Sequence, residues 1–476
     1  MIWFNLFFLT IMVVNNESRV NLAKLGATLQ YLPLEFKFLL NLFFVCASIL
    51  IYHFLKTLFS SKLLNNMFLE KWHKVFLIFC VTIFCFLPAS IFIGYNYDLI
   101  DTYFRAFGVG HVKPNFLDLR GTLAAINKVK EVGDGYQIDC PNEPCIGWRW
   151  TYGSSILKLN RFAIFSEPRT YLFAVIFMII FLYTIYLMSK NIKNSIIFLT
   201  LIPTGTMMLI IERMNIDILI LPLIYFLAKF SYRNTCMLFF APMLILLAAS
   251  VKYYPLVLFA PLLFFVNSYK YRAYYVLCFL LGIIYIIPEL KLAGIQNFDY
   301  GYSATYGLKN LIGLVNGNSD PTLTLSILTL IGFVFFCFIA YTSFNGFKID
   351  KIQSNQKIIN FSLYCYAFAV LLSSWVLNSN YPYRLICVLA MIPYLVDKIE
   401  HNKELVLTLF SSVITFFVTI PVTLSPVRNL TLTFFIALNI GILIKIYSSN
   451  IILSKSQKSN LNSCRNSKNL LLEKYF

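Results

Sequence analysis

Long uninterrupted apolar runs recur along this chain from about residue 36 to residue 447. At a rise of about 1.5 Å per residue, most of them are long enough to cross roughly 30 Å of hydrocarbon as α-helices. The runs are continuously apolar rather than alternating every second residue, and this favours helices over a β-barrel. The sequence therefore predicts an all-α, polytopic transmembrane helix bundle.

The apolar runs predict about thirteen spans. They lie at approximately 36–58, 75–95, 169–189, 195–211, 216–229, 235–251, 254–268, 273–290, 323–343, 358–377, 383–397, 404–421 and 430–447. We divide the chain into an N-terminal segment with one span (1–74), a transmembrane domain (75–447) and a basic tail (448–476). Met1–Val14 is a poor signal peptide and a marginal span, so whether it crosses the membrane stays open.

Composition excludes a water-soluble globule of this size. Hydrophobic residues make up 59% of the chain and charged residues 13%, too little charge to cover a soluble surface. The formal net charge of +18 could suggest nucleic-acid binding. However, the basic residues lie in short connections between apolar runs, where they act as topology signals.

These basic connections predict the orientation of the bundle. With the spans above, all of the Lys and Arg clusters in short loops fall on one face, which is then cytoplasmic. The clusters are Lys62, Lys71 and Lys74; Lys190 and Lys193; Lys229 and Arg233; Lys270 and Arg272; Lys348, Lys351 and Lys357; Lys398 and Lys403; and the tail.

The opposite, outer face receives the polar features that need an explanation. These are a large loop (96–168), a second loop (291–322) and three short motifs, Glu212-Arg-Met-Asn-Ile-Asp217, Ser250-Val-Lys-Tyr-Tyr-Pro255 and Asn380-Tyr-Pro-Tyr-Arg384. Burying such groups in lipid would cost several kcal/mol. Their collection on one side indicates a site at the outer membrane surface.

The large loop contains one amphipathic helix. Phe116, Leu119, Leu123, Ile126 and Val129 recur at spacings of three and four and form one apolar stripe. Asn115 suits an N-cap and Gly133 a C-terminal stop, and we expect the helix to lie along the membrane interface. Asp118, in its first turn, is either a capping acid or a carboxylate held there as a general base.

Cys140 and Cys145 share the large loop, in Asp-Cys-Pro-Asn-Glu-Pro-Cys. On the oxidising side of the membrane this short spacing predicts a disulfide that braces the loop. No Cys-x-x-Cys pair or His/Cys cluster indicates a zinc site. Trp148, Trp150 and Tyr152 follow as an aromatic belt or, alternatively, as a cavity wall.

The motifs resemble those of a bacterial family. The Glu-Arg-Met-Asn-Ile-Asp turn, followed one hairpin later by Ala-Ala-Ser-Val-Lys-Tyr-Tyr-Pro, is similar to the glycosyltransferase family 87 / DUF2029 group of GT-C membrane glycosyltransferases. Phe116-Leu-Asp-Leu-Arg120 also fits the acid near the start of that family's first outer loop. Met214 stands where the family usually has glycine, and its Tyr-Pro-Pro before the next helix is absent here. The resemblance covers roughly residues 75–300.

The resemblance implies a hexosyl- or pentosyltransferase of the bacterial inner membrane, with its active face outward. It would move a sugar from a polyprenyl-phosphate donor to a glycan or lipid-linked acceptor. The leaving phosphate needs cationic groups, and Arg213, Lys252 and Arg384 are the candidates. The alternative role for these three side chains is to extend towards the lipid headgroups.

The acceptor hydroxyl needs a base, and Asp118 is the best match to the acid that the resemblance implies. Its rivals in the same loop are Asp98, Asp101 and Asp134. Asn215, Asp217 and Tyr253 are candidates for contact with sugar hydroxyls, with helix capping as the alternative for Asn215 and Asp217. Nothing in the spacing of these residues requires a cofactor. A divalent metal would fit if Asp118 paired with a second acid.

Two other functions compete with the transferase. An O-antigen polymerase or ligase would take a diphosphate-linked oligosaccharide and need no catalytic carboxylate. A transporter of lipid-linked glycans would place charges near the bilayer midplane and show a repeat between halves, and neither is evident. The transferase hypothesis requires that Asp118, Arg213 and Lys252 lie together, since a separation beyond about 15 Å is too far to share one phosphosugar.

Overall fold

The computed structural model describes residues 116–132, 154–292 and 355–445, with short gaps inside the last two ranges, together with Phe104 and Val109. Within these residues every regular element is a helix and no strand is formed, which confirms the all-helical prediction for this part of the chain. The α-helices and 3-10 helices (η) are α6 Leu117–Val132, α7 Ser154–Leu157, η2 Lys158–Arg161, η3 Glu167–Arg169, α8 Thr170–Met188, α9 Ile192–Leu201, α10 Gly205–Arg213, η4 Ile216–Leu219, α11 Ile220–Phe230, α12 Thr235–Val251, η5 Tyr254–Leu258, α13 Phe259–Phe265, α14 Tyr269–Leu292, α17 Asn355–Val376, η7 Pro382–Met391, α18 Ile392–Lys398 and α19 Lys403–Val418. A further helix covers Thr431–Lys445.

Three helical segments of the described residues are long and apolar enough to cross a membrane. They are Glu167–Met188, Tyr269–Glu289 and Gln356–Val376, and they match the predicted spans 169–189, 273–290 and 358–377. The length and apolar character of these segments are consistent with a membrane protein. The predicted spans 36–58, 75–95 and 323–343 lie outside the described residues, as do residues 96–115 other than Phe104 and Val109, Cys140, Cys145 and the loop 293–322. The total of about thirteen spans remains a prediction.

The predicted span 195–211 is not one straight helix. α9 and α10 meet at an angle of 70°, so they form either one broken span or a re-entrant pair. The sequence between them is Ile202-Pro203-Thr204, and a proline cannot supply the N–H that a continuing helix needs. Thr204 is extended (φ −124°, ψ 161°) and restarts the helix as the N-cap of α10.

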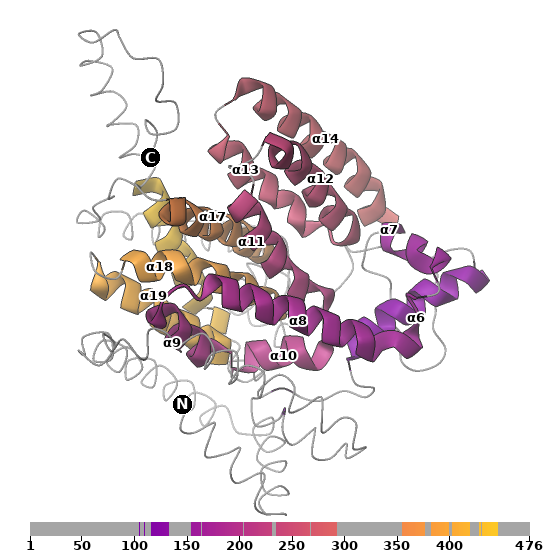
Figure 1. Cartoon of the computed structure of the whole chain (residues 1–476), viewed down its shortest axis with the longest axis horizontal. Helices are drawn as coiled ribbons and strands as arrows, with labels where there is room; N and C mark the ends of the chain where they lie inside the picture. The colour runs from indigo at the N-terminus through magenta and orange to yellow at the C-terminus, as the bar shows by residue number, and fades with distance from the viewer. Residues whose placement is uncertain are drawn as a thin grey trace, which may run out of the picture.

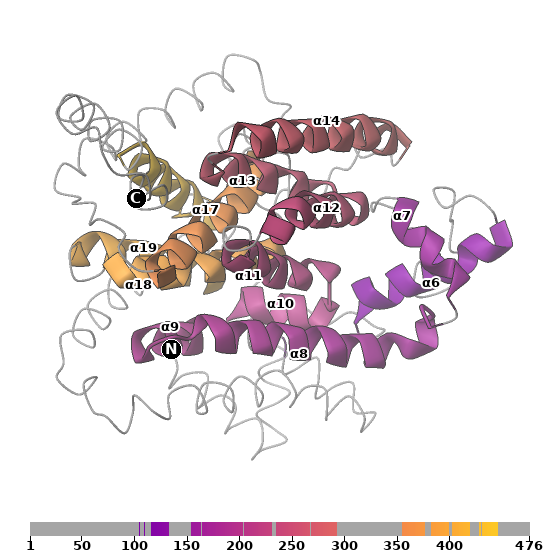
Figure 2. The same ribbon diagram turned by 45° about the horizontal axis from the view of Figure 1, so that its top comes forward.

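The helices are arranged with two distinct ends (Figures 1 and 2). α6 and α7 lie at one end of the long helix α8, which we call the α6 end, whereas α9, α18 and α19 lie at the other. α17 packs against η7, α11 and α18, and α12 packs against α14. Fully buried apolar side chains such as Leu221, Tyr364 and Ile386 fill the space between these helices.

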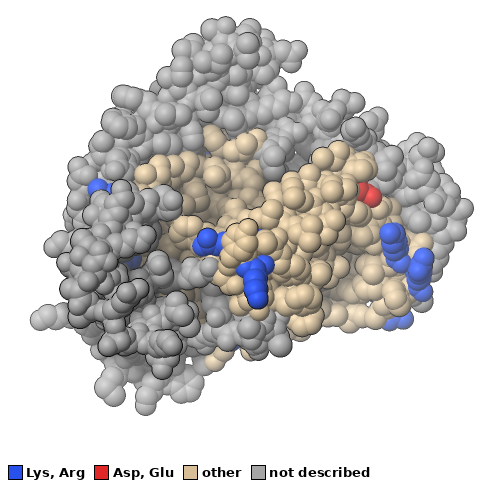
Figure 3. All heavy atoms as spheres, turned by 90° about the horizontal axis from the view of Figure 1, so that it is seen from above, with Lys and Arg blue, Asp and Glu red and all other residues tan. Residues whose placement is uncertain are grey.

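The outer faces of α8 and α14 are apolar. Ile179 and Tyr183 on α8 are 55% and 61% exposed, and Ile284 on α14 is 67% exposed. Figure 3 shows a face on which Lys, Arg and acidic groups occupy only a few places in the described part. Water would disfavour such surfaces, whereas lipid tails would cover them.

α6 confirms the predicted amphipathic helix, but its apolar stripe contacts protein. Phe116, Leu119, Leu123 and Ile126 are all buried. Phe116 packs edge-on against Tyr171 of α8, with ring centroids 5.7 Å apart. The stripe therefore holds α6 on the end of the bundle rather than facing lipid, because neighbouring helices bury the same apolar area that lipid would.

A close approach between α14 and η5 generates a prediction. A Cβ atom on Gly282 of α14 would come within 2.5 Å of Leu256 Cδ1 and 2.9 Å of Leu246 Cδ2. Gly282→Leu should therefore overpack this contact and cost about 1–3 kcal/mol. Ala273→Leu adds similar bulk on an exposed position of the same helix and should be nearly neutral. Thermal unfolding of the detergent-solubilised variants measures both, and equal midpoints would contradict the packing.

Candidate active site

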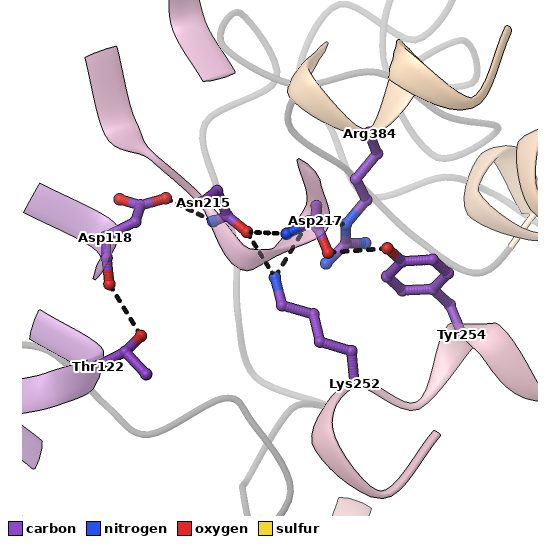
Figure 4. Close-up of polar contacts among 7 residues, drawn as sticks. All are labelled: Asp118, Thr122, Asn215, Asp217, Lys252, Tyr254 and Arg384. Atoms are coloured by element: carbon purple, nitrogen blue, oxygen red, sulfur yellow. Dashed lines mark hydrogen bonds and ion pairs between the residues drawn. The ribbon is translucent and has the colours of Figure 1, made fainter. Parts of the chain in front are cut away.

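Polar side chains from four separate segments meet at the α6 end of the bundle. Asp118 comes from the first turn of α6, Asn215 and Asp217 from the α10–η4 connection, Lys252 and Tyr254 from the α12–η5 connection, and Arg384 from η7. Figure 4 shows these side chains directed toward one another. With Arg213, at the end of α10, and its neighbour Glu212, they form what we call the polar cluster.

The α10–η4 connection is a sharp turn that aims two side chains. Met214 ends α10 in the left-handed conformation, with φ 46° and ψ 48°. Asn215 then caps η4, because its Oδ1 accepts a hydrogen bond of 3.0 Å from the backbone N–H of Asp217. This cap confirms that Asn215 has a structural role, and it leaves the side-chain amide group free to point out of the turn.

The ion pair of Lys252 and Asp217 forms the centre of the cluster. Lys252 Nζ donates to Asp217 Oδ2 at 3.0 Å and to Asn215 Oδ1 at 3.0 Å. The side chains of Lys252 and Asp217 are only 11% and 1% exposed. Removal of two charges from water to this extent is costly, and these direct contacts compensate for it.

Tyr254 and Arg384 complete the environment of Asp217. Tyr254 OH donates to Asp217 Oδ1 at 2.8 Å, and Arg384 Nε lies 3.4 Å from Asp217 Oδ2. The Arg384 guanidinium also lies over the Tyr254 ring, 5.2 Å from its centroid. Both Asp217 oxygens are therefore engaged, while the Arg384 side chain stays 26% exposed.

Asp118 lies on the other side of Asn215. Its Oδ2 accepts a hydrogen bond of 2.6 Å from Asn215 Nδ2, and its Oδ1 lies 4.0 Å from Arg213 Nη1. Arg213 Nε also pairs with the buried Glu212 at 2.8 Å. Asp118 is thus more than a capping acid of α6, because its carboxylate contacts the α10–η4 turn.

Burial controls the ionisation of the cluster. Loss of water raises the pKa of the Asp118 carboxyl, and the charge of Arg213 and the hydrogen bond from Asn215 offset this only in part. Loss of water likewise lowers the pKa of the Lys252 ammonium against the attraction of Asp217. A carboxyl with a raised pKa is a stronger base when ionised, as general-base catalysis requires.

Three side-chain contacts outside the cluster hold α6 and α7 in place. Arg120 of α6 pairs with Glu167 at 3.0 Å. The carboxylate of Glu289, near the end of α14, accepts from both the backbone N–H (2.9 Å) and the hydroxyl (2.7 Å) of Ser154. Ser155 donates to the Ser250 carbonyl, two residues before Lys252. The segments that carry Asp118 and Lys252 are therefore tied to α8 and α14.

The structure brings together most of the residues that the sequence singled out. Asp118, Arg213, Asn215, Asp217, Lys252 and Arg384 all belong to the polar cluster. Tyr253 lies beside it but buries its hydroxyl, whereas the adjacent Tyr254 contacts Asp217.

Sequence reasoning missed Tyr254 and Glu212. Glu212 lies next to Arg213 in the same motif, so the sequence could have indicated an ion pair between these two residues. In contrast, the choice between two adjacent tyrosines depends on the backbone of the turn. Among the described residues, no group of three or more His, Cys, Asp or Glu side chains is placed to hold a metal ion.

The central ion pair predicts unequal effects of two isosteric substitutions. Asp217→Asn leaves the buried Lys252 charge without its counter-ion and should cost roughly 3–5 kcal/mol of folding stability. Asp118→Asn keeps an acceptor for Asn215 and loses only a longer, partly exposed ion pair, so it should cost no more than about 1 kcal/mol. Thermal unfolding in detergent compares the two, and equal losses would contradict this description of the centre.

Comparisons of the chain with protein-family models, with curated proteins and with solved structures found no match. The chemistry that the polar cluster can perform is therefore inferred from its own residues, their distances and their burial.

Proposed function

We propose that this protein is a membrane glycosyltransferase of the GT-C type, which moves a sugar from a polyprenyl-phosphate donor to a glycan or lipid-linked acceptor. The observation that carries the proposal is the meeting of one carboxylate, Asp118, with the cations Arg213, Lys252 and Arg384 in a single cluster. A sugar phosphate needs both kinds of group. The base serves the attacking hydroxyl and the cations serve the leaving phosphate.

In this mechanism Asp118 Oδ1 takes the proton of the acceptor hydroxyl. The acceptor oxygen attacks the anomeric carbon, and the bond between that carbon and the phosphate oxygen breaks. The electron pair leaves with the polyprenyl phosphate. Arg213 and Arg384 are the cations with the most exposed side chains, at 22% and 26%, and they are suited to receive this charge through forked hydrogen bonds.

Charge balance in the cluster also favours a donor with a single phosphate. Three acids, Asp118, Asp217 and Glu212, are paired with three cations, Arg213, Lys252 and Arg384. With all six ionised the cluster is formally neutral. A phosphodiester adds one negative charge to it, whereas a diphosphate adds at least two, which the same cations would compensate less well.

The turn at Met214 supports the resemblance to glycosyltransferase family 87. Met214 stands where that family usually has glycine, and its φ of 46° is in the left-handed region that glycine adopts without strain. A methionine in this conformation costs about 1–2 kcal/mol of backbone strain. A left-handed turn at this position is one that glycine would adopt without strain, which is in keeping with the resemblance.

The position of the cluster favours an outward active face in a bacterial inner membrane. The cluster lies at the α6 end, while Lys190 in the α8–α9 connection and Lys398 at the end of α18 lie at the opposite end. Basic connections mark the cytoplasmic side of membrane proteins. Lipid-linked donors that have crossed the membrane would then meet Asp118 at the outer surface.

Reconstituted full-length protein tests the proposal directly. Given polyprenyl-phosphate sugars and a bacterial envelope extract as acceptor, the wild-type protein should release polyprenyl phosphate and form a glycosidic product. Asp118→Asn should lower the rate by at least about 100-fold, the range of general-base catalysis, while remaining folded. Asn360→Ala, a polar change away from the cluster, should leave the rate unchanged.

Other outcomes of the same assay separate the competing functions. Use of diphosphate-linked oligosaccharides alone, with full activity in Asp118→Asn, would indicate a polymerase or ligase. Movement of the lipid-linked sugar across the bilayer without a glycosidic product would indicate a transporter. Either outcome contradicts the proposed function.

The pH dependence of transfer should report the burial of Asp118. Because the base must be ionised, activity should rise with pH through the pKa of Asp118. Burial raises that pKa, so the midpoint of the acidic limb should lie above the ordinary aspartate value of about 3.9. A rate that stays constant down to that value would contradict Asp118 as the base.

A further inference from the structure

The hydrogen bonds of Asn215 define a role for this residue that differs from sugar contact. Asn215 Oδ1 accepts from two donors, the backbone N–H of Asp217 at 3.0 Å and Lys252 Nζ at 3.0 Å. An amide oxygen has two acceptor sites, so both are in use. The orientation of the side-chain amide is thereby fixed, and its NH2 group must point the other way.

The NH2 group of Asn215 points at the carboxylate of Asp118. The distance between Asn215 Nδ2 and Asp118 Oδ2 is 2.6 Å, which is within hydrogen-bond distance and shorter than most N–H···O hydrogen bonds. An amide NH2 group can only donate, so Asp118 Oδ2 must accept. Oδ1, near Arg213, then remains as the oxygen that can take a proton.

We propose that Asn215 is a positioning residue, which selects Oδ1 of Asp118 as the basic atom and stabilises the ionised form of that carboxylate. This inference rests on the proposed function in taking Asp118 as the base. It reassigns Asn215 from binding the sugar to holding the group that activates the acceptor. Lys252 and the Asp217 backbone act through it, because they fix which way the amide faces.

The protonation of Asp118 also depends on the charged and titratable groups around it. Arg213 and Glu212 of α10 and Lys252 act on it directly. Of the other elements packed against α6, η3 carries Arg169 and Glu167, and Glu167 pairs with Arg120. α8 carries Tyr171, Tyr183 and Tyr186, and η2 carries Lys158 and Arg161. α7 has no titratable side chain. A change at Asn215 leaves all of these charges in place.

Labelling by a carbodiimide tests the inference without reference to activity. N,N′-dicyclohexylcarbodiimide reacts with protonated carboxyl groups in apolar surroundings, and mass spectrometry of the Asp118 peptide gives the labelled fraction at each pH. In Asn215→Ala the ionised form loses its hydrogen bond, so the labelling midpoint of Asp118 should rise by about 1 pH unit or more.

Asn215→Asp keeps the shape of the side chain and the oxygen that accepts from Lys252, but it removes the donor. Two carboxyl groups would then face each other across 2.6 Å and titrate as a pair, with one of them protonated to a higher pH than Asp118 alone. The pH range over which the pair is labelled should therefore extend to higher pH than the labelling of Asp118 in Asn215→Ala. This variant tests the donor even if the alanine variant does not fold.

A second asparagine–aspartate pair in the same chain supplies the control. Asn360 Nδ2 of α17 donates to Asp397 Oδ2 of α18 at 2.5 Å, at the end of the bundle opposite Asp118. Asn360→Ala should leave the midpoint of Asp118 unchanged.

An unchanged Asp118 midpoint in both Asn215 variants would overturn the inference, as would an equal shift in Asn360→Ala. The proposed function fails by a different measurement, the absence of glycosyl transfer by the wild-type protein.

Discussion

The ion pair between Lys252 and Asp217 is the interaction on which the rest of this site depends. It lies almost out of contact with solvent, where a lone charge would be strongly disfavoured. Its formation requires that the α10–η4 and α12–η5 turns stand side by side. Lys252 also fixes the amide of Asn215, and Asn215 in turn holds Asp118. One buried pair thus connects Asp118 of α6 with the turns that follow α10 and α12.

The helices of the bundle supply the rigidity that such a site needs. Apolar side chains fix α10, α11, α17 and η7 against one another, while α6 is tied to α8 by Arg120 and Glu167. The residues of the polar cluster gather at the α6 end, where helices end and their connections turn. An apolar helix bundle can therefore hold a cluster of charged side chains at one end.

Much of this architecture follows from the sequence. Continuous apolar runs predicted spans at 169–189, 273–290 and 358–377, and long apolar helical segments lie at Glu167–Met188, Tyr269–Glu289 and Gln356–Val376, because hydrocarbon tolerates little else. The three polar motifs pointed to one end because buried charge needs a partner. The bend between α9 and α10 was missed, since the apolar run around Pro203 continues on both sides. The choice of Tyr254 over Tyr253 was also out of reach, because it depends on the backbone of the turn after Val251. The functions assigned to the cluster residues remain proposals.

The proposed transfer reaction depends on where the donor phosphate binds. The most direct measurement is an electron cryo-microscopy structure of the full-length protein in a lipid nanodisc with a polyprenyl-phosphate sugar bound. We expect phosphate oxygens within about 3 Å of guanidinium nitrogens of Arg213 or Arg384, with the anomeric carbon on the side of Asp118 Oδ1. A phosphate bound at the opposite end of the bundle, or more than about 15 Å from Asp118, would contradict the assignment of this cluster as the active site.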